Sequence, residues 1–122
     1  MKRSGWAYID HMAIACDELL EYTQGINSGE ELKNADSKTR RAVAMCLLDL
    51  GELCKKLSDD ERNEFPSEHW HKIIGFRNRS AHGYHELSFE IVYDIVKNRI
   101  PALRCFFKEK MSSMEEFDDV MP

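Results

Sequence analysis

The sequence of 122 residues lacks any apolar segment long enough to cross a membrane. Its longest uninterrupted apolar run extends from Ala42 to Leu48, whereas a membrane-spanning helix needs about 20 apolar residues. Lys2 and Arg3 give the start of the chain a basic character, but no apolar signal-peptide core follows them. We therefore expect a cytoplasmic protein with no membrane association.

Paired cysteines and recognisable metal-binding spacings are also missing. None of the four cysteines stands in a Cys-x-x-Cys motif, and each falls on the apolar side of a helical pattern: Cys16, Cys46, Cys54 and Cys105. Such cysteines are typically small buried side chains, so neither disulfides nor a zinc site are expected. A Gly-rich phosphate loop and a His-Glu-x-x-His helix are absent as well. The sequence predicts no metal and no cofactor.

Strand patterns are missing too, since no stretch alternates strictly between apolar and polar residues and no Asn-Gly turn occurs. Apolar residues instead recur at steps of three and four, which is typical of amphipathic helices. We predict a single all-α domain over residues 1–122, an up-down helical bundle of four main helices with short connecting helices.

The helix boundaries are predicted from capping residues and helix breakers. Main helices are expected at residues 5–23, 36–57 and from 67 to a stop near Gly83, and a fourth from Ser88 that kinks or restarts at Pro101. Ser28 and Ser58 each begin a capping box, which predicts short helices after them. The acidic tail from about residue 112 to residue 122 is expected to fray.

The helix at residues 36–57 carries an apolar stripe wide enough to contact two neighbours, which makes it the candidate central helix. Gly51 in its interior costs about 1 kcal/mol relative to alanine. Either another backbone approaches closely there, or the glycine is merely tolerated. Glu52 and Lys55 beside it could face a site, although a solvated helix face is the preferred interpretation.

The net charge of −5 argues against binding nucleic acid over the whole surface, but basic residues cluster locally, including at positions 72–79. The densest polar stretch is Arg77-Asn78-Arg79-Ser80-Ala81-His82-Gly83-Tyr84. Arginine suits a phosphate or a phosphoryl transition state, and histidine moves protons near neutral pH. From the residues alone, a phosphate site and a simple polar helix terminus both remain open.

This stretch matches the R-x-x-x-x-H-x-Y motif and resembles the HepT-like toxins, which belong to the HEPN domains. The resemblance extends from about Trp6 to Lys108 and includes the Gly51-Glu52 segment and the Ile100-Pro101 segment. His85 departs mildly from the pattern, since an apolar or aromatic residue is more usual there.

The resemblance implies a homodimer in which the motifs of both chains face a shared cleft, and a metal-independent ribonuclease that acts as a toxin on RNA. Arg77 and His82 then form the catalytic pair, and Asn78 assists. Tyr84 is the residue to which a minimal nucleotidyltransferase antitoxin, of the MntA type, transfers AMP.

Two other interpretations remain open at this stage. The chain could be a helical dimer that binds a nucleotide or a nucleotidyltransferase through Arg77, Asn78 and His82 without cleaving RNA. It could also be a structural adaptor in which the motif only ends a helix. The concentration of polar groups argues against the adaptor, since a cap requires far fewer.

Overall fold

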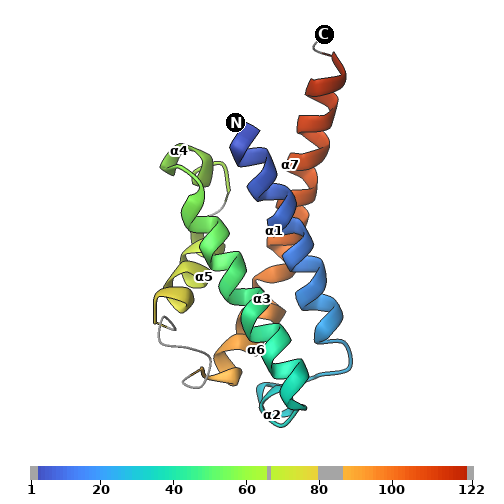
Figure 1. Cartoon of the computed structure of the whole chain (residues 1–122), viewed down its shortest axis with the longest axis vertical. Coiled ribbons are helices and arrows are strands. Elements are labelled where there is room, and N and C mark those ends of the chain that lie inside the picture. The colour runs from blue at the N-terminus through green and yellow to red at the C-terminus, as the bar shows by residue number, and fades with distance from the viewer. Residues whose placement is uncertain (1–2, 66, 80–86, 121–122) are drawn as a thin grey trace.

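A computed structural model describes the backbone of residues 3–65, 67–79 and 87–120. Within these ranges the chain forms helices and no strands, in the order α1 Arg3–Tyr22, α2 Gly29–Lys33, α3 Ser37–Lys56, α4 Asp59–Arg62, α5 Ser67–Arg79, α6 Phe89–Asn98 and α7 Ile100–Val120. Figure 1 shows α1, α3 and α7 running along the long axis of the molecule, with α5 and α6 beside them. The prediction of an all-α bundle is confirmed.

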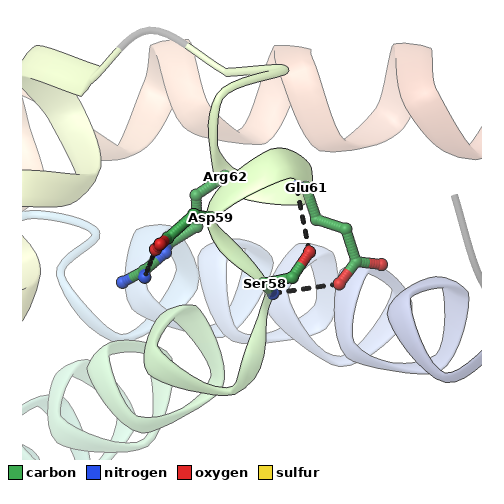
Figure 2. A network of polar contacts seen from close by, with 4 residues as sticks. All are labelled: Ser58, Asp59, Glu61 and Arg62. Atoms are coloured by element: carbon green, nitrogen blue, oxygen red, sulfur yellow. Dashed lines mark hydrogen bonds and ion pairs between the residues drawn. The ribbon is translucent and has the colours of Figure 1, made fainter.

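The short connecting helices begin where the sequence places their caps. The Ser58 hydroxyl accepts a hydrogen bond from the backbone N–H of Glu61 at 3.2 Å, and the Glu61 carboxylate accepts one from the backbone N–H of Ser58 at 3.0 Å. Figure 2 shows this reciprocal pair at the start of α4. The two bonds satisfy donors that a helix N-terminus otherwise leaves free, so α3 can end and α4 begin within two residues.

The other caps follow the same physical rule. Ser28 accepts from the backbone N–H of Glu31 at the start of α2, and Asp36 accepts from that of Thr39 at the start of α3. Ser88 accepts from the backbone N–H of Ile91 and begins α6 at Phe89. These helix starts are confirmed as predicted.

The core lies between α1, α3, α5 and α7. α1 packs against both α3 and α7, and α3 packs against both α1 and α5. The central position predicted for α3 is therefore confirmed by its two neighbours. The largest fully buried side chains come from all four long helices and from α2 and α6: Ile9, Met12, Leu19, Leu32, Val43, Leu47, Leu50, Ile73, Val92, Ile100, Leu103 and Phe107.

The predicted interruption at Pro101 takes the form of a restart. α6 ends at Asn98, Arg99 is its C-terminal cap, and α7 begins at Ile100. Proline is tolerated there because backbone N–H groups in the first turn of a helix have no intrahelical acceptor. α7 then continues as a helix to Val120, through the segment that the sequence suggested would fray. Its Lys, Glu and Met residues are strong helix formers.

α1 and α7 are also joined by ionic contacts. Arg104 and Lys108 of α7 both bind the carboxylate of Asp17 on α1, the lysine at 3.0 Å. Because hydrogen bonds from these two cations favour the ionised carboxylate, they lower the pKa of Asp17. We call this cluster of Asp17, Arg104 and Lys108 the Asp17 clamp; it links α1 to α7.

Three of the four cysteines are buried, and the prediction was wrong for the fourth. Cys16, Cys46 and Cys54 lie in the core, whereas Cys105 is exposed on α7. Position 105 falls beside the apolar stripe of α7, between the buried Leu103 and Phe107, and therefore points away from the core. Burial raises the pKa of the Cys46 and Cys54 thiols to about 12 and raises that of Cys16 further.

Across the part of the chain that is described, the helices are either too short or too polar to span a bilayer.

Candidate active site

The site predicted from the sequence begins at the C-terminal end of α5. Ile73 and Phe76 of this helix are buried in the core, which fixes the rotation of the helix about its axis. Arg77 follows Phe76 and lies on the side of α5 that faces α3. The Arg77 side chain is 30% exposed, so part of it can meet solvent or a ligand while the rest packs between the helices.

Gly51 allows this close approach of α5 to α3. A Cβ atom added at Gly51 would stand 2.7 Å from Cβ of Arg77 and 3.3 Å from the carbonyl oxygen of Ile73. Separations as short as the first are not found between real side chains, so any larger residue must push the helices apart. Of the two explanations left open for this glycine, close backbone approach is confirmed.

α3 also supplies the polar partners of the site. The carboxylate of Glu52 forms an ion pair with Nε of Arg77, and Nζ of Lys55 donates a hydrogen bond to Oδ1 of Asn78 at 3.3 Å. The preferred interpretation of a solvated helix face was wrong for Glu52, because its carboxylate pairs with Arg77. Lys55 is exposed, as that interpretation expected, and it also contacts Asn78. The sequence contains one indication of these contacts: Glu52 and Lys55 are three residues apart, which places them on one side of the helix, and Glu52 directly follows the glycine at position 51.

Together these contacts assemble four polar side chains from two helices: Glu52, Lys55, Arg77 and Asn78. Two are cations that can bind a phosphate, and one carboxylate holds the arginine in place. Arginine offers several N–H donors, so an Nε contact with Glu52 leaves the terminal nitrogens available to a second anion. The arrangement suits the binding of a phosphodiester.

The start of α5 is positioned by α4. Figure 2 shows Arg62 beside Asp59, with which it forms an ion pair. The Arg62 guanidinium also lies over the ring of Trp70 on α5, 5.3 Å from the ring centroid. Such a cation–π contact contributes about 0.5–1 kcal/mol at exposed sites. It helps to hold α5 against the bundle at the end opposite to Arg77.

A groove of about 440 Å³ lies between α5 and α6, lined by His71, Lys72, Gly75, Arg79, Ile91, Asp94 and Ile95. Arg79 is two residues beyond Arg77 and therefore leaves the helix on a different side. The basic residues of positions 72–79 are thus divided between two faces of α5.

The remaining predicted site residues, His82 and Tyr84, lie outside the described residues, as do Gly83 and His85. The helix stop predicted near Gly83 falls in the same segment. Within the described part of the chain, no three His, Cys, Asp or Glu side chains gather as a metal site would require.

Comparisons with known proteins agree with this arrangement. Residues 12–109 match the family described as ribonuclease HepT-like, which includes the whole Arg77–Tyr84 stretch. The chain therefore belongs to the HepT-like ribonuclease family of the HEPN superfamily.

Several curated relatives carry corresponding names. "Putative RNase MJ0127" of Methanocaldococcus jannaschii is 33% identical over 84 residues, which cover 69% of this chain and 68% of the relative. "Probable ribonuclease HepT" of Thermococcus cleftensis is 29% identical over 109 residues, covering 89% and 97% of the two chains. "Putative RNase TTE0752" of Caldanaerobacter subterraneus is 28% identical over 102 residues, covering 84% and 89%. No solved structure shows a significant match.

Proposed function

We propose that this chain is the toxin of a toxin–antitoxin pair and that it cleaves RNA without a metal ion. The observation that supports this most is the pairing of Arg77 and Asn78 on α5 with Glu52 and Lys55 on α3. These residues gather a phosphate-binding arginine and a second cation inside the region that matches the ribonuclease family.

The proposed reaction is an attack of a ribose 2′-oxygen on the adjacent phosphorus, with release of the 5′-oxygen of the next nucleotide. The 2′-hydroxyl loses its proton to a base, and the leaving oxygen gains a proton from an acid. His82 carries out this proton transfer, and Arg77 stabilises the charge that develops on the phosphoryl oxygens. Asn78 helps to orient the phosphate.

In the proposed homodimer each chain contributes one His82, so acid and base can come from opposite subunits. This division of roles would explain why a small monomer needs a partner.

The proposed silencing step is the transfer of AMP to Tyr84 by a minimal nucleotidyltransferase. The Tyr84 hydroxyl attacks the α-phosphate of ATP, and pyrophosphate leaves. The added phosphate brings negative charge and bulk to a site that binds RNA phosphates, so it opposes RNA entry. Incubation with the transferase and ATP, followed by peptide mapping, should find the modification at Tyr84; a modified residue elsewhere argues against this step.

Expression in a bacterial host tests the proposed toxin directly. The wild type should arrest growth, and Arg77→Ala and His82→Ala should each abolish the arrest. Arg40→Ala is a matched control, because Arg40 donates a hydrogen bond to the Lys33 carbonyl, far along α3 from the site. It should leave the arrest unchanged.

Purified protein gives the corresponding measurement on RNA. Cleavage by the wild type should persist in EDTA and should fall by at least about 100-fold in His82→Ala, the usual size of a general acid–base contribution. Equal cleavage by wild type and His82→Ala would contradict the assignment of this residue. Binding of RNA without cleavage by the wild type would favour the non-cleaving binder.

A further inference from the structure

The groove between α5 and α6 is lined by two cations that belong to α5, Lys72 and Arg79. They are seven residues apart, which places them about two turns apart on one side of the helix. Both side chains are exposed. A Cβ atom placed at Gly75 would stand 3.4 Å from Nη1 of Arg79, so the guanidinium extends back along α5 into the groove.

These two cations differ from others in the molecule in their lack of an acidic partner. The cations of α7 each contact a carboxylate. Among the described residues, no ion pair or hydrogen bond joins Lys72 or Arg79 to a carboxylate, although acidic residues outnumber basic ones by 22 to 17. Asp94, on the α6 side of the groove, instead accepts a hydrogen bond from the side chain of Asn98 at 2.7 Å. The groove therefore presents two cations to an anion from outside the chain.

The same groove offers surfaces on which a flat ring can pack. Ile91, in the first turn of α6, is 47% exposed although it is large and apolar. On the α5 side, the ring of His71 is supported by the ring of Trp70, with 3.8 Å between the ring centroids. Cations beside exposed rings and apolar side chains are typical of sites for single-stranded nucleic acid, where the cations bind phosphates and the bases stack.

The position of the groove favours RNA over an acidic protein segment as its ligand. Arg77 and Arg79 both lie in the last turn of α5, and they leave the helix on different sides. A strand whose scissile phosphate is bound by Arg77 can therefore pass α5 and continue into the groove. A double helix is too stiff to turn around one α-helix about 10 Å across, whereas a single strand is flexible enough.

We infer that the α5–α6 groove is a second binding site for single-stranded RNA and holds nucleotides next to the bond that is cleaved. Lys72 and Arg79 bind phosphates, and His71 and Ile91 support bases. These residues contribute affinity and take no part in the chemical step. The choice of RNA as the ligand rests on the proposed function.

Variants that remove one charge test this site. Fluorescence anisotropy measures the binding of a short single-stranded RNA whose 2′-oxygens are methylated and which therefore cannot be cleaved. Lys72→Gln and Arg79→Gln should each weaken binding about fivefold at about 0.1 M salt, and each should reduce the slope of log affinity against log salt by about 0.7. Arg40→Gln removes the same charge far along α3 and should change neither quantity.

Two further measurements locate the strand and define its form. An RNA duplex of the same sequence should bind more weakly than the single strand and should respond little to either substitution. Single-stranded RNA that contains thiouridine, irradiated in complex with the wild type, should cross-link to peptides that carry His71 or Ile91. A duplex that binds as tightly as the single strand, with the same losses, contradicts the preference for single strands.

Circular dichroism checks that each variant is folded, and the cross-link on the wild type decides the matter if one is not. Folded variants that bind like the wild type with an unchanged slope overturn the inference and leave the groove to an acidic protein partner. An equal loss in Arg40→Gln, cross-links only elsewhere, or a wild type that binds no single-stranded RNA also overturns it.

The same measurements separate this inference from the proposed function. A wild type that binds RNA through the groove but does not cleave unmodified RNA contradicts the proposed function alone. A wild type that cleaves RNA, while both groove variants bind as it does, contradicts the inference alone.

Discussion

At the scale of single residues, Glu52 is the side chain whose contacts in the fold differ most from those that the sequence suggested. A glutamate next to a glycine in a charged helix looks like a solvated residue. In the folded chain its carboxylate binds Nε of Arg77. It therefore orients the arginine and at the same time competes with any phosphate that approaches the guanidinium.

We predict that Glu52→Gln lowers kcat for RNA cleavage by about tenfold, since a misplaced arginine stabilises the transition state less well. KM for RNA should not rise, because removing the carboxylate also removes a competitor of the phosphate. Steady-state kinetics at concentrations that preserve the native mass measure both constants. Glu64→Gln, which breaks the ion pair with Lys110, is the control and should change neither. A higher KM with unchanged kcat would show that Glu52 acts on binding alone.

The four cysteines differ in their exposure to solvent, which predicts different reactivity. Native protein treated with iodoacetamide near neutral pH should gain one label per chain, on Cys105, because the other three thiols are buried and have raised pKa values. Unfolded protein should gain four labels, the number of cysteines in the chain. Intact-mass spectrometry counts them; a second rapid label on folded protein would contradict the packing of α1 against α3.

At the scale of elements, the contact between α3 and α5 positions the site. We predict that Gly51→Ala impairs cleavage more than it impairs folding. Alanine gains about 1 kcal/mol in helix propensity, whereas overpacking typically costs about 1–3 kcal/mol, so the net loss of unfolding free energy is small. The displacement of Arg77 should nevertheless lower kcat by about tenfold or more.

Denaturant unfolding and RNA cleavage, measured on the same sample, separate these two effects. Gly75→Ala is the matched control, because an added Cβ there would meet only the flexible end of Arg79, at 3.4 Å. If Gly51→Ala keeps full activity, the close contact is not needed for catalysis.

The Asp17 clamp between α1 and α7 predicts a pH dependence of stability. The folded-state pKa of Asp17 is lowered by Arg104 and Lys108, so its contribution is present above the ordinary aspartate value of 3.8 and is lost as pH falls through the lower folded value. Asp17→Asn should reduce the free energy of unfolding at neutral pH by no more than about 1 kcal/mol, because the side chains are partly exposed. The difference between wild type and variant should disappear in acid, as urea titrations at several pH values would reveal. A difference that persists in strong acid would have another cause.

At the scale of the whole molecule, an acidic protein has to bind a polyanion. The proposed function places the RNA contacts at the few cations near Arg77, on a protein whose net charge is −5, so we expect a weak salt dependence. The logarithm of RNA affinity should fall against the logarithm of salt concentration with a slope of about −1.5 to −3, since each phosphate contact on a single strand contributes about −0.7. Fluorescence anisotropy with a non-cleavable RNA measures this slope. A much steeper slope would indicate a wider basic surface.

The sequence predicts the helices of this molecule well because the deciding interactions are local. Ser28, Asp36, Ser58 and Ser88 each accept hydrogen bonds from backbone N–H groups within the next three residues, so their effect is visible in the chain itself. Pro101 acts just as locally on the helix that contains it.

The contacts of the site are not local and were predicted less well. Glu52 and Arg77 are far apart in the chain, and only the packing of α5 onto α3 reveals that they meet. The roles of His82 and Tyr84 remain predictions that rest on the family motif. Whether Cys105 is buried depends on how α7 is rotated about its axis. The buried side chains of Leu103 and Phe107 determine that rotation, whereas the broad apolar stripe in the sequence does not reveal it.

The Asp17 clamp has a consequence for how the protein is made. Asp17 and Arg104 are 87 positions apart, and the helices that carry them form one of the two most extensive pairings in the bundle. A ribosome therefore releases α1, α3 and α5 well before α7 emerges to cover the apolar side of α1. Such long-range pairing has to wait for the late part of the chain. The nascent protein passes through a stage in which α1, α3 and α5 exist but the bundle is open, and the complete bundle forms only after α7 has emerged.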